Sequence, residues 1–126
     1  MPKDPIKGDG WAVATLTDLG EGPGFRKVRS ALDVTAFGVN AVVLPPGHRT
    51  GGHFHERQQE LYLVLEGEIE FEFGDGERQT LGPLSVARVD PRTVRRLRNV
   101  SDSDEAMYLC IGGDGGYVGR DGTYVD

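Results

Sequence analysis

The sequence has little that would support disulfides, long helices, membrane spans or polyanion binding. Cys110 is the only cysteine among 126 residues, so no disulfide can form within the chain. No segment repeats apolar residues at helical spacing over several turns. No apolar run approaches the ~20 residues that a membrane helix needs. A formal net charge of −6 opposes binding to nucleic acid and to anionic membranes.

These absences define a narrow class of protein. The length fits a single domain over residues 1–126. The first ten residues contain no apolar stretch of the kind found in signal peptides. We therefore expect a cytoplasmic protein in a reducing compartment, with neither nucleic acid nor membrane as a partner.

Glycine and short apolar segments are what the chain has in abundance. Its 19 glycines and seven prolines separate segments rich in Val, Leu, Phe and Tyr. Strands are expected at 11–17, 37–44, 60–67, 68–73, 84–89, 94–99 and 106–112. The pattern predicts an all-β sandwich or barrel of antiparallel strands with few or no helices. The ends, 1–10 and 112–126, are expected to be less regular.

Two neighbouring segments predict which side chains face inward. Residues 68–73 alternate Glu with Ile or Phe, so one face of that strand is buried. Residues 61–65 are apolar on both faces. Tyr62 and Val64 follow Glu60 at period two and would line an interior cavity with it. Their neighbours would then face outward and pack against a second copy in a homodimer: Leu61, Leu63 and Leu65.

The stretch GHFHERQQE, residues 52–60, concentrates possible metal ligands. His53 and His55 share one face of a strand, because side chains two apart point the same way. Glu60 opens the next strand after a short turn and can return alongside the histidines as an antiparallel pair. Two imidazoles and one carboxylate suit iron(II), zinc or manganese. The alternative is a His-x-His pair on a strand surface that binds no metal.

The longer segment GHRTGGHFHERQQELYLVLEG, residues 47–67, resembles the first motif of the cupin superfamily. The fixed positions of that motif fall on Gly47, His53, His55, Glu60 and Gly67. The resemblance covers about residues 35–112 and implies a single jelly-roll β-barrel. It also implies that the two histidines and Glu60 line the barrel as ligands of a divalent metal. Iron, manganese, zinc and nickel are not distinguished, and the alternative of no metal stays open.

The second cupin motif is degraded in residues 81–99, LGPLSVARVDPRTVRRLRN. Aligning the family's asparagine with Asn99 places Arg95 where the family has a histidine as fourth ligand. A guanidinium cannot ligate a metal. We take Arg95, Tyr62 and Asn99 as candidate substrate-binding residues.

Three arrangements of Arg95 are open. Alternation places Arg95 on the same face as Leu97, which is the natural core residue, so the arginine should point inward. It can turn aside from a three-ligand metal and clamp an anionic group of the substrate. It can instead pair with Glu60 and leave no metal site. Alternatively, the register is shifted by one and Arg95 lies on the surface.

Other reactive residues have ordinary interpretations. His48 follows a Pro-Pro-Gly turn, which favours a solvated loop residue over a replacement ligand. Cys110 lies in an apolar strand and is expected to line the core or a pocket. Most of the five arginines from Arg88 to Arg98 are expected to be exposed and to form a solvated, salt-bridged face.

Two functions lead for the chain as a whole, and an oligomerisation or scaffolding protein is a third possibility. The first is a small cupin-like protein that binds a divalent metal and a small anionic metabolite, for which the resemblance allows an oxygenase, an isomerase or a decarboxylase. The second is a non-catalytic ligand-binding or sensing module with a retired metal site. The sequence does not choose between an enzyme and a binding protein.

Overall fold

The computed structural model describes residues 2–125, whose regular structure is nearly all β. The strands are β1 (Ile6–Gly8), β2 (Trp11–Val13), β3 (Gly24–Arg26), β4 (Gly38–Leu44), β5 (Gly52–His55), β6 (Gln59–Glu66), β7 (Ile69–Phe73), β8 (Arg78–Leu81), β9 (Val86–Val89), β10 (Arg95–Asn99), β11 (Ala106–Gly113) and β12 (Gly122–Val125). A 3-10 helix, η1 (Leu16–Leu19), and a short α-helix, α1 (Val28–Leu32), complete the described elements. The predicted all-β fold is confirmed, and no helix in residues 2–125 is long and apolar enough to cross a membrane.

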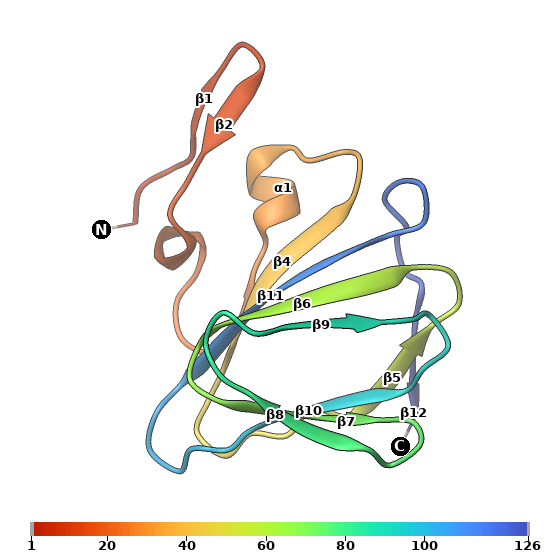
Figure 1. Cartoon of the computed structure of the whole chain (residues 1–126). Coiled ribbons are helices and arrows are strands. Elements are labelled where there is room, and N and C mark those ends of the chain that lie inside the picture. The colour runs from red at the N-terminus through yellow and green to blue at the C-terminus, as the bar shows by residue number, and fades with distance from the viewer. Residues whose placement is uncertain (1, 126) are drawn as a thin grey trace.

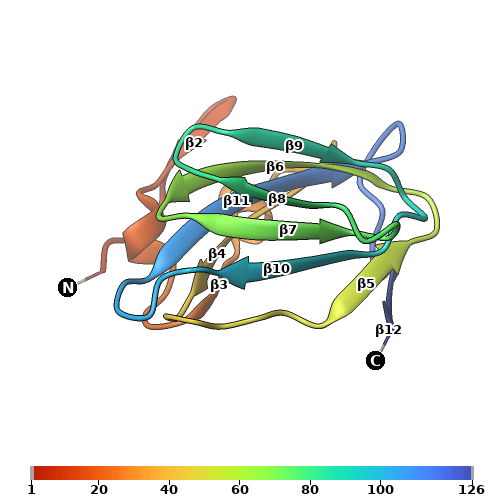
Figure 2. The same ribbon diagram turned by 60° about the horizontal axis from the view of Figure 1, so that its bottom comes forward.

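Within residues 2–125 the strands form two five-stranded sheets and one separate hairpin, all antiparallel. The first sheet has the order β12-β5-β10-β7-β8 and the second β3-β4-β11-β6-β9. The sheets face each other as the two halves of a jelly roll (Figures 1 and 2). The β1–β2 hairpin projects away from them (Figure 1).

The core lies between the two sheets and follows the predicted alternation. Ile69 and Phe71 are fully buried. The carboxylates of Glu70 and Glu72, which alternate with them, lie within 3.5 Å of arginine nitrogens on neighbouring strands. The buried cluster also contains Val42, Leu44, Tyr62, Val64, Val89, Leu97, Ala106 and Tyr108. Burying each large side chain contributes about 1.5–3 kcal/mol, so this contact between sheets is the main stabilising term.

The structure corrects the sequence-based expectations outside the core. The strand expected at 11–17 ends at Val13, and η1 follows it. The ends at 1–10 and 112–126 were expected to be less regular, yet β1 pairs with β2 and β12 pairs with β5. β12 has β5 as its only strand neighbour in the described sheets, so pairing with an existing edge orders a segment too rich in glycine to order itself.

Asn99 holds together one end of the barrel. Its side chain is fully buried, and Nδ2 donates to the carbonyl oxygens of Leu44, Pro45 and Asp104 at 2.8–3.2 Å. Its Oδ1 accepts the N–H of Ser101 at 3.0 Å. One amide thus ties the end of β4 to the loop before β11, which gives Asn99 a structural role.

Replacing Asn99 with alanine should strongly destabilise the protein. The change removes the donor for three carbonyls and the acceptor for one N–H, and buried groups left unpaired cost about 1–3 kcal/mol each, partly recovered by water. We expect a loss of roughly 2–4 kcal/mol in the free energy of unfolding, measured in urea. Asn40→Ala is the matched control, because Asn40 makes no side-chain hydrogen bond to the described residues. Equal stability of the two variants would contradict this role.

Candidate metal centre

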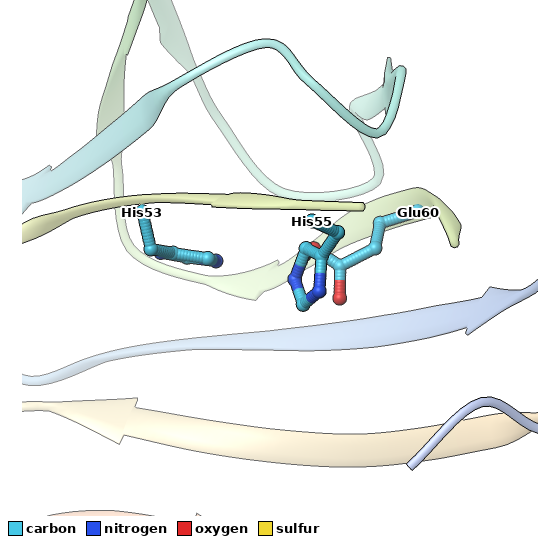
Figure 3. Close-up of side chains that lie close together, drawn as sticks. All are labelled: His53, His55 and Glu60. Atoms are coloured by element: carbon cyan, nitrogen blue, oxygen red, sulfur yellow. The ribbon is translucent and has the colours of Figure 1, made fainter. Parts of the chain in front are cut away.

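The three predicted ligands come from strands in opposite sheets. His53 and His55 lie on β5 of the first sheet, and Glu60 lies near the start of β6 in the second. The expected antiparallel pairing of Glu60 with the histidine strand is therefore wrong: the chain crosses between the sheets at residues 56–58. Figure 3 shows the three side chains extending to the same side, with the His55 ring next to the Glu60 carboxylate.

The donor atoms of these side chains converge. One ligand atom from each of His53, His55 and Glu60 lies within 4.8 Å of the other two. His55 Nε2 lies 3.3 Å from Glu60 Oε1. The two imidazole rings are nearly perpendicular, with centroids separated by 5.3 Å. His55 and Glu60 are buried and His53 is half-buried, so the cluster is closed on one side and open on the other.

Glu60 is ionised and held in place by its neighbours. The Tyr62 hydroxyl donates to Oε1 at 2.7 Å and Gln58 Nε2 donates to Oε2 at 2.9 Å. Burial acts to raise the pKa of Glu60, but the hydrogen bonds from His55 and Tyr62 and the charges of His55 and Arg95 outweigh it and hold this pKa at about 2. The carboxylate is therefore available as an anionic ligand at neutral pH.

His53 is held in its neutral form. Burial and the nearby Arg95 cation lower the pKa of His53 from 6.5 to about 4, against the opposing effect of Glu60. A neutral imidazole keeps a lone pair for coordination. The ring also lies 5.9 Å from the ring of Tyr124, which β12 places opposite it.

Arg95 points inward, as alternation predicts, and the surface arrangement is wrong. Arg95 is the register partner of His53 where β10 pairs with β5, and its side chain has no exposed surface. Its Nη2 donates to the carbonyl of Asp90 at 3.0 Å, and its Nη1 lies 3.9 Å from Glu60 Oε1. Nε and Nη1 have no hydrogen-bond partner among the described residues. The guanidinium is thus turned toward Asp90 while remaining within ion-pair distance of Glu60.

A cavity of about 910 Å³ opens beside the cluster. His53, His55, Glu60 and Tyr62 line it, whereas Arg95 and Asn99 are not among its lining residues. Of the three candidate substrate-binding residues, the structure therefore brings only Tyr62 to the cavity.

Cys110 and His48 also lie in the cavity wall. Burial, followed by the nearby Glu60, raises the pKa of the Cys110 thiol well above its ordinary value, so the thiol stays protonated and is a poor nucleophile. His48 is exposed and does not join the three-residue cluster. Both placements agree with the sequence-based interpretation.

Two residues of the site escaped sequence analysis. Gln58 is buried, with Nε2 3.2 Å from His55 Nδ1 as well as hydrogen-bonded to Glu60. Asp121 Oδ2 lies 3.8 Å from His55 Nδ1 and accepts hydrogen bonds from the backbone N–H groups of Arg57 and Gln58. Extending the period-two pattern of β6 back by one step identifies Gln58, but no local pattern points to Asp121.

Three of the five arginines from Arg88 to Arg98 form the expected salt-bridged face, whereas Arg95 is buried. Arg88 pairs with Asp90 at 3.2 Å and Arg92 with Glu56 at 2.6 Å. Arg98 pairs with Glu70 at 3.4 Å. These exposed or partly exposed pairs contribute little to stability individually.

The residues present fit a divalent metal. A tetrahedral or octahedral ion with ligands at about 2.0–2.2 Å needs donor atoms roughly 3–3.5 Å apart. The donor atoms of the cluster all lie within 4.8 Å of one another, which is close to that spacing. Both the ionised Glu60 and the neutral His53 are in the protonation states that coordination requires.

Comparison with known proteins identifies the fold family. Residues 40–112, more than half of the chain, match the cupin domain family. Among curated protein sequences, none matches this chain. A crystal structure of a cupin protein from Bacteroides fragilis superposes with a TM-score of 0.70 at 20% identity, covering 92% of each chain.

Two further structures share the fold but belong to longer chains. A sugar phosphate isomerase of the cupin superfamily from Silicibacter pomeroyi has a TM-score of 0.66 at 23% identity, covering 94% of this chain and 67% of that one. A DMSP lyase from Ruegeria pomeroyi has a TM-score of 0.62 at 22% identity, covering 71% of this chain. This chain spans 43% of the lyase. Identities this low establish the fold alone.

The metal-free protein should lose stability as the pH falls from 6.5 toward 4. In the folded protein the pKa of His53 is about 4, below its ordinary 6.5, so the unfolded chain binds a proton in this window and the folded chain does not. Because His53 is partly exposed, we expect a loss of about 1 kcal/mol, or ~4 °C in Tm. Stability linked to Glu60 is lost only below about pH 4.5.

Thermal unfolding of chelator-treated protein measures this dependence. His53→Gln should lose the part of the slope between pH 6.5 and 4, whereas His48→Gln, at an exposed position, should retain it. The same dependence of stability on pH in the His53 variant and in the wild type would contradict the lowered pKa of His53.

Proposed function

The chain belongs to the cupin superfamily, and on that premise we propose that it binds a divalent metal through His53, His55 and Glu60 and a small anionic metabolite in the adjoining cavity. The observation that carries this proposal is the convergence of three donor groups from two sheets on one cavity wall. The metal is one of iron, manganese, zinc and nickel. The cavity volume, about 910 Å³, is in the range that accommodates metabolite-sized ligands.

The residues around the cluster prepare it for such a role. Tyr62 and Gln58 each donate to one oxygen of Glu60 and so fix the orientation of the carboxylate. The Cys110 thiol, held protonated, adds no competing nucleophile to the wall. A bound divalent ion would supply Lewis acidity, which polarises a substrate oxygen or assists reactions with dioxygen. An oxygenase, an isomerase or a decarboxylase would each use these elements, and the similar structures include a sugar phosphate isomerase and a DMSP lyase.

Arg95 favours a second candidate, a binding or sensing module with a retired metal site. Its buried cation lies 3.9 Å from Glu60, where it neutralises part of the charge that a metal would otherwise balance. In this alternative the histidines contribute only to packing, and ligands bind without a metal.

The outer face of the second sheet supports the proposal of a homodimer. Leu61 is 42% exposed and Val86 is 58% exposed, and Leu63 pairs directly with Val86 across β6 and β9. Leu109 and Ile111 on β11 extend the same apolar face, which we call the outer apolar face. A second copy would bury it.

The same proposal places the protein in the cytoplasm, whose reducing conditions suit the free thiol of Cys110.

Replacing both histidines should abolish metal binding while leaving the fold intact. At free metal about 100-fold above its Kd, binding stabilises the wild type by ~2.7 kcal/mol, and this increment should vanish in the double variant His53→Ala, His55→Ala. Differential scanning fluorimetry with and without Mn²⁺, Zn²⁺, Ni²⁺ and anaerobic Fe²⁺ measures the change.

His48→Ala is the control for that experiment, because it removes the one histidine outside the cluster. It should keep the full metal-dependent stabilisation. If the double variant is stabilised by metal as strongly as the wild type, the ions bind elsewhere and the proposed centre is wrong. If no metal stabilises the wild type, the binding-module alternative replaces it.

A charge on the outer apolar face should separate the homodimer. Leu61→Glu places a carboxylate in the proposed interface, where burial without a partner costs several kcal/mol, so we expect the mass in light scattering to fall to about 13.7 kDa. Ile6→Glu on the projecting hairpin is the control, since Ile6 is also exposed but lies outside this face. A wild type that is already monomeric at micromolar concentration would contradict the proposal.

A further inference from the structure

The charged lining of the cavity is more basic than the protein as a whole. The chain carries a net charge of −6, yet the wall contains the cations Lys27, Arg29 and Arg120 and, among the described residues, only two carboxylates, Glu60 and Asp121. The cations come from the segment that begins α1 and from the loop before β12, which lie in separate parts of the chain (Figure 1). A positive cavity on an acidic protein attracts anions that the rest of the surface repels.

Neither carboxylate of the wall lies within ion-pair distance of these cations. Both oxygens of Glu60 accept hydrogen bonds, from Tyr62 and from Gln58. Oδ2 of Asp121 accepts the backbone N–H groups of Arg57 and Gln58 at 2.9 and 2.8 Å. Each carboxylate is therefore held by its own neighbours on β6 or on the β5–β6 turn.

The three cations also lack carboxylate partners elsewhere in residues 2–125. Five exposed or half-buried arginines of the protein lie within 4.0 Å of an acidic side chain, namely Arg57, Arg78, Arg88, Arg92 and Arg98. Lys27, Arg29 and Arg120 form no such pair with the described residues. Their charge is left for solvent or for a ligand.

Arg29 is positioned without being neutralised. Its guanidinium carbon lies 4.0 Å from the centroid of the Tyr117 ring, a cation–π contact. Tyr117 in turn packs against Gly38 at the start of β4, where an added Cβ would lie 3.4 Å from the ring. Stacking holds the face of the guanidinium and leaves its N–H edge free to donate to a planar or tetrahedral oxyanion.

From these observations we propose that Lys27, Arg29 and Arg120 form an anion subsite in the cavity wall, which binds a carboxylate or phosphate group of the ligand. The proposal rests on the proposed function, because the other end of that ligand would face His53, His55 and Glu60. It gives the anion-binding role to three residues that sequence analysis passed over. Arg95, the earlier candidate, lies outside the cavity lining and is directed to Asp90.

Binding of small anions and their neutral counterparts tests the subsite. Isothermal titration at low ionic strength would compare succinate with succinamide and glycerol 3-phosphate with glycerol. The wild type should bind at least one anion about tenfold more tightly than its neutral counterpart, and added salt should weaken that preference. The tighter of the two anions identifies the group as a carboxylate or a phosphate. No preference for either anion would overturn the proposal.

The triple variant Lys27→Gln, Arg29→Gln, Arg120→Gln should lose the preference by about tenfold or more. The matched control, Lys3→Gln, Arg78→Gln, Arg88→Gln, removes one lysine and two arginines from exposed positions outside the cavity wall and should retain it. If the triple variant does not fold, Lys27→Gln, Arg120→Gln keeps the Arg29–Tyr117 contact and should still lose several-fold. If the cavity variant and the control variant lose the preference for the anion equally, the preference depends only on net charge and the proposed subsite is overturned.

Repeating the titration after chelation, and in the His53→Ala, His55→Ala variant, separates this proposal from the metal centre. Anion preference that depends on the three cations but not on metal supports the subsite even if no metal binds. Metal-dependent stabilisation with no effect of the three cations on anion binding supports the metal centre and overturns the subsite.

Discussion

The buried carboxylate of Glu60 is the point on which the site depends. It enters from one sheet, meets His55 from the other at 3.3 Å, and accepts hydrogen bonds from Tyr62 and Gln58. A buried carboxylate without partners would take up a proton or destabilise the fold. Here its neighbours hold the pKa at about 2, so the barrel carries a permanent negative charge beside two imidazoles. A divalent cation is the natural counterpart of that arrangement.

Arg95 makes this arrangement different from a site with four ligands. Two unit charges about 4 Å apart attract by ~4 kcal/mol at an effective dielectric constant of about 20, which is comparable with the cost of burying either one. The cation helps keep Glu60 ionised and His53 neutral, the states that ligate metals. Its donation to Asp90 directs it away from the cluster, but its charge still opposes a second cation nearby. The affinity of the centre for metal therefore depends on how these two effects balance.

Sequence periodicity predicted the inward row of each central strand. Glu60, Tyr62 and Val64 on β6, Ile69 and Phe71 on β7, and Arg95 and Leu97 on β10 all face inward as the alternation of side chains requires. The convergence of the two histidines with Glu60 was also predicted, although the strands that carry them were expected to pair and instead belong to opposite sheets.

What periodicity could not predict depends on contacts between distant segments. β12 is ordered by pairing with β5, and Asp121 reaches the β5–β6 turn only because of that pairing. Asn99 was assigned to the ligand by its place in a motif, but its amide is fully used by backbone groups. The cations of the cavity wall come from segments without regular apolar spacing, so nothing local distinguishes them from solvated residues.

The metal content of protein purified without a histidine tag tests the central claim most directly. Elemental analysis should find about one divalent ion per chain after growth with iron, manganese, zinc and nickel, since three converging ligands, with Glu60 ionised and His53 neutral, retain a metal through purification. Less than about a tenth of an ion per chain, unchanged by any of these supplements, would contradict the account.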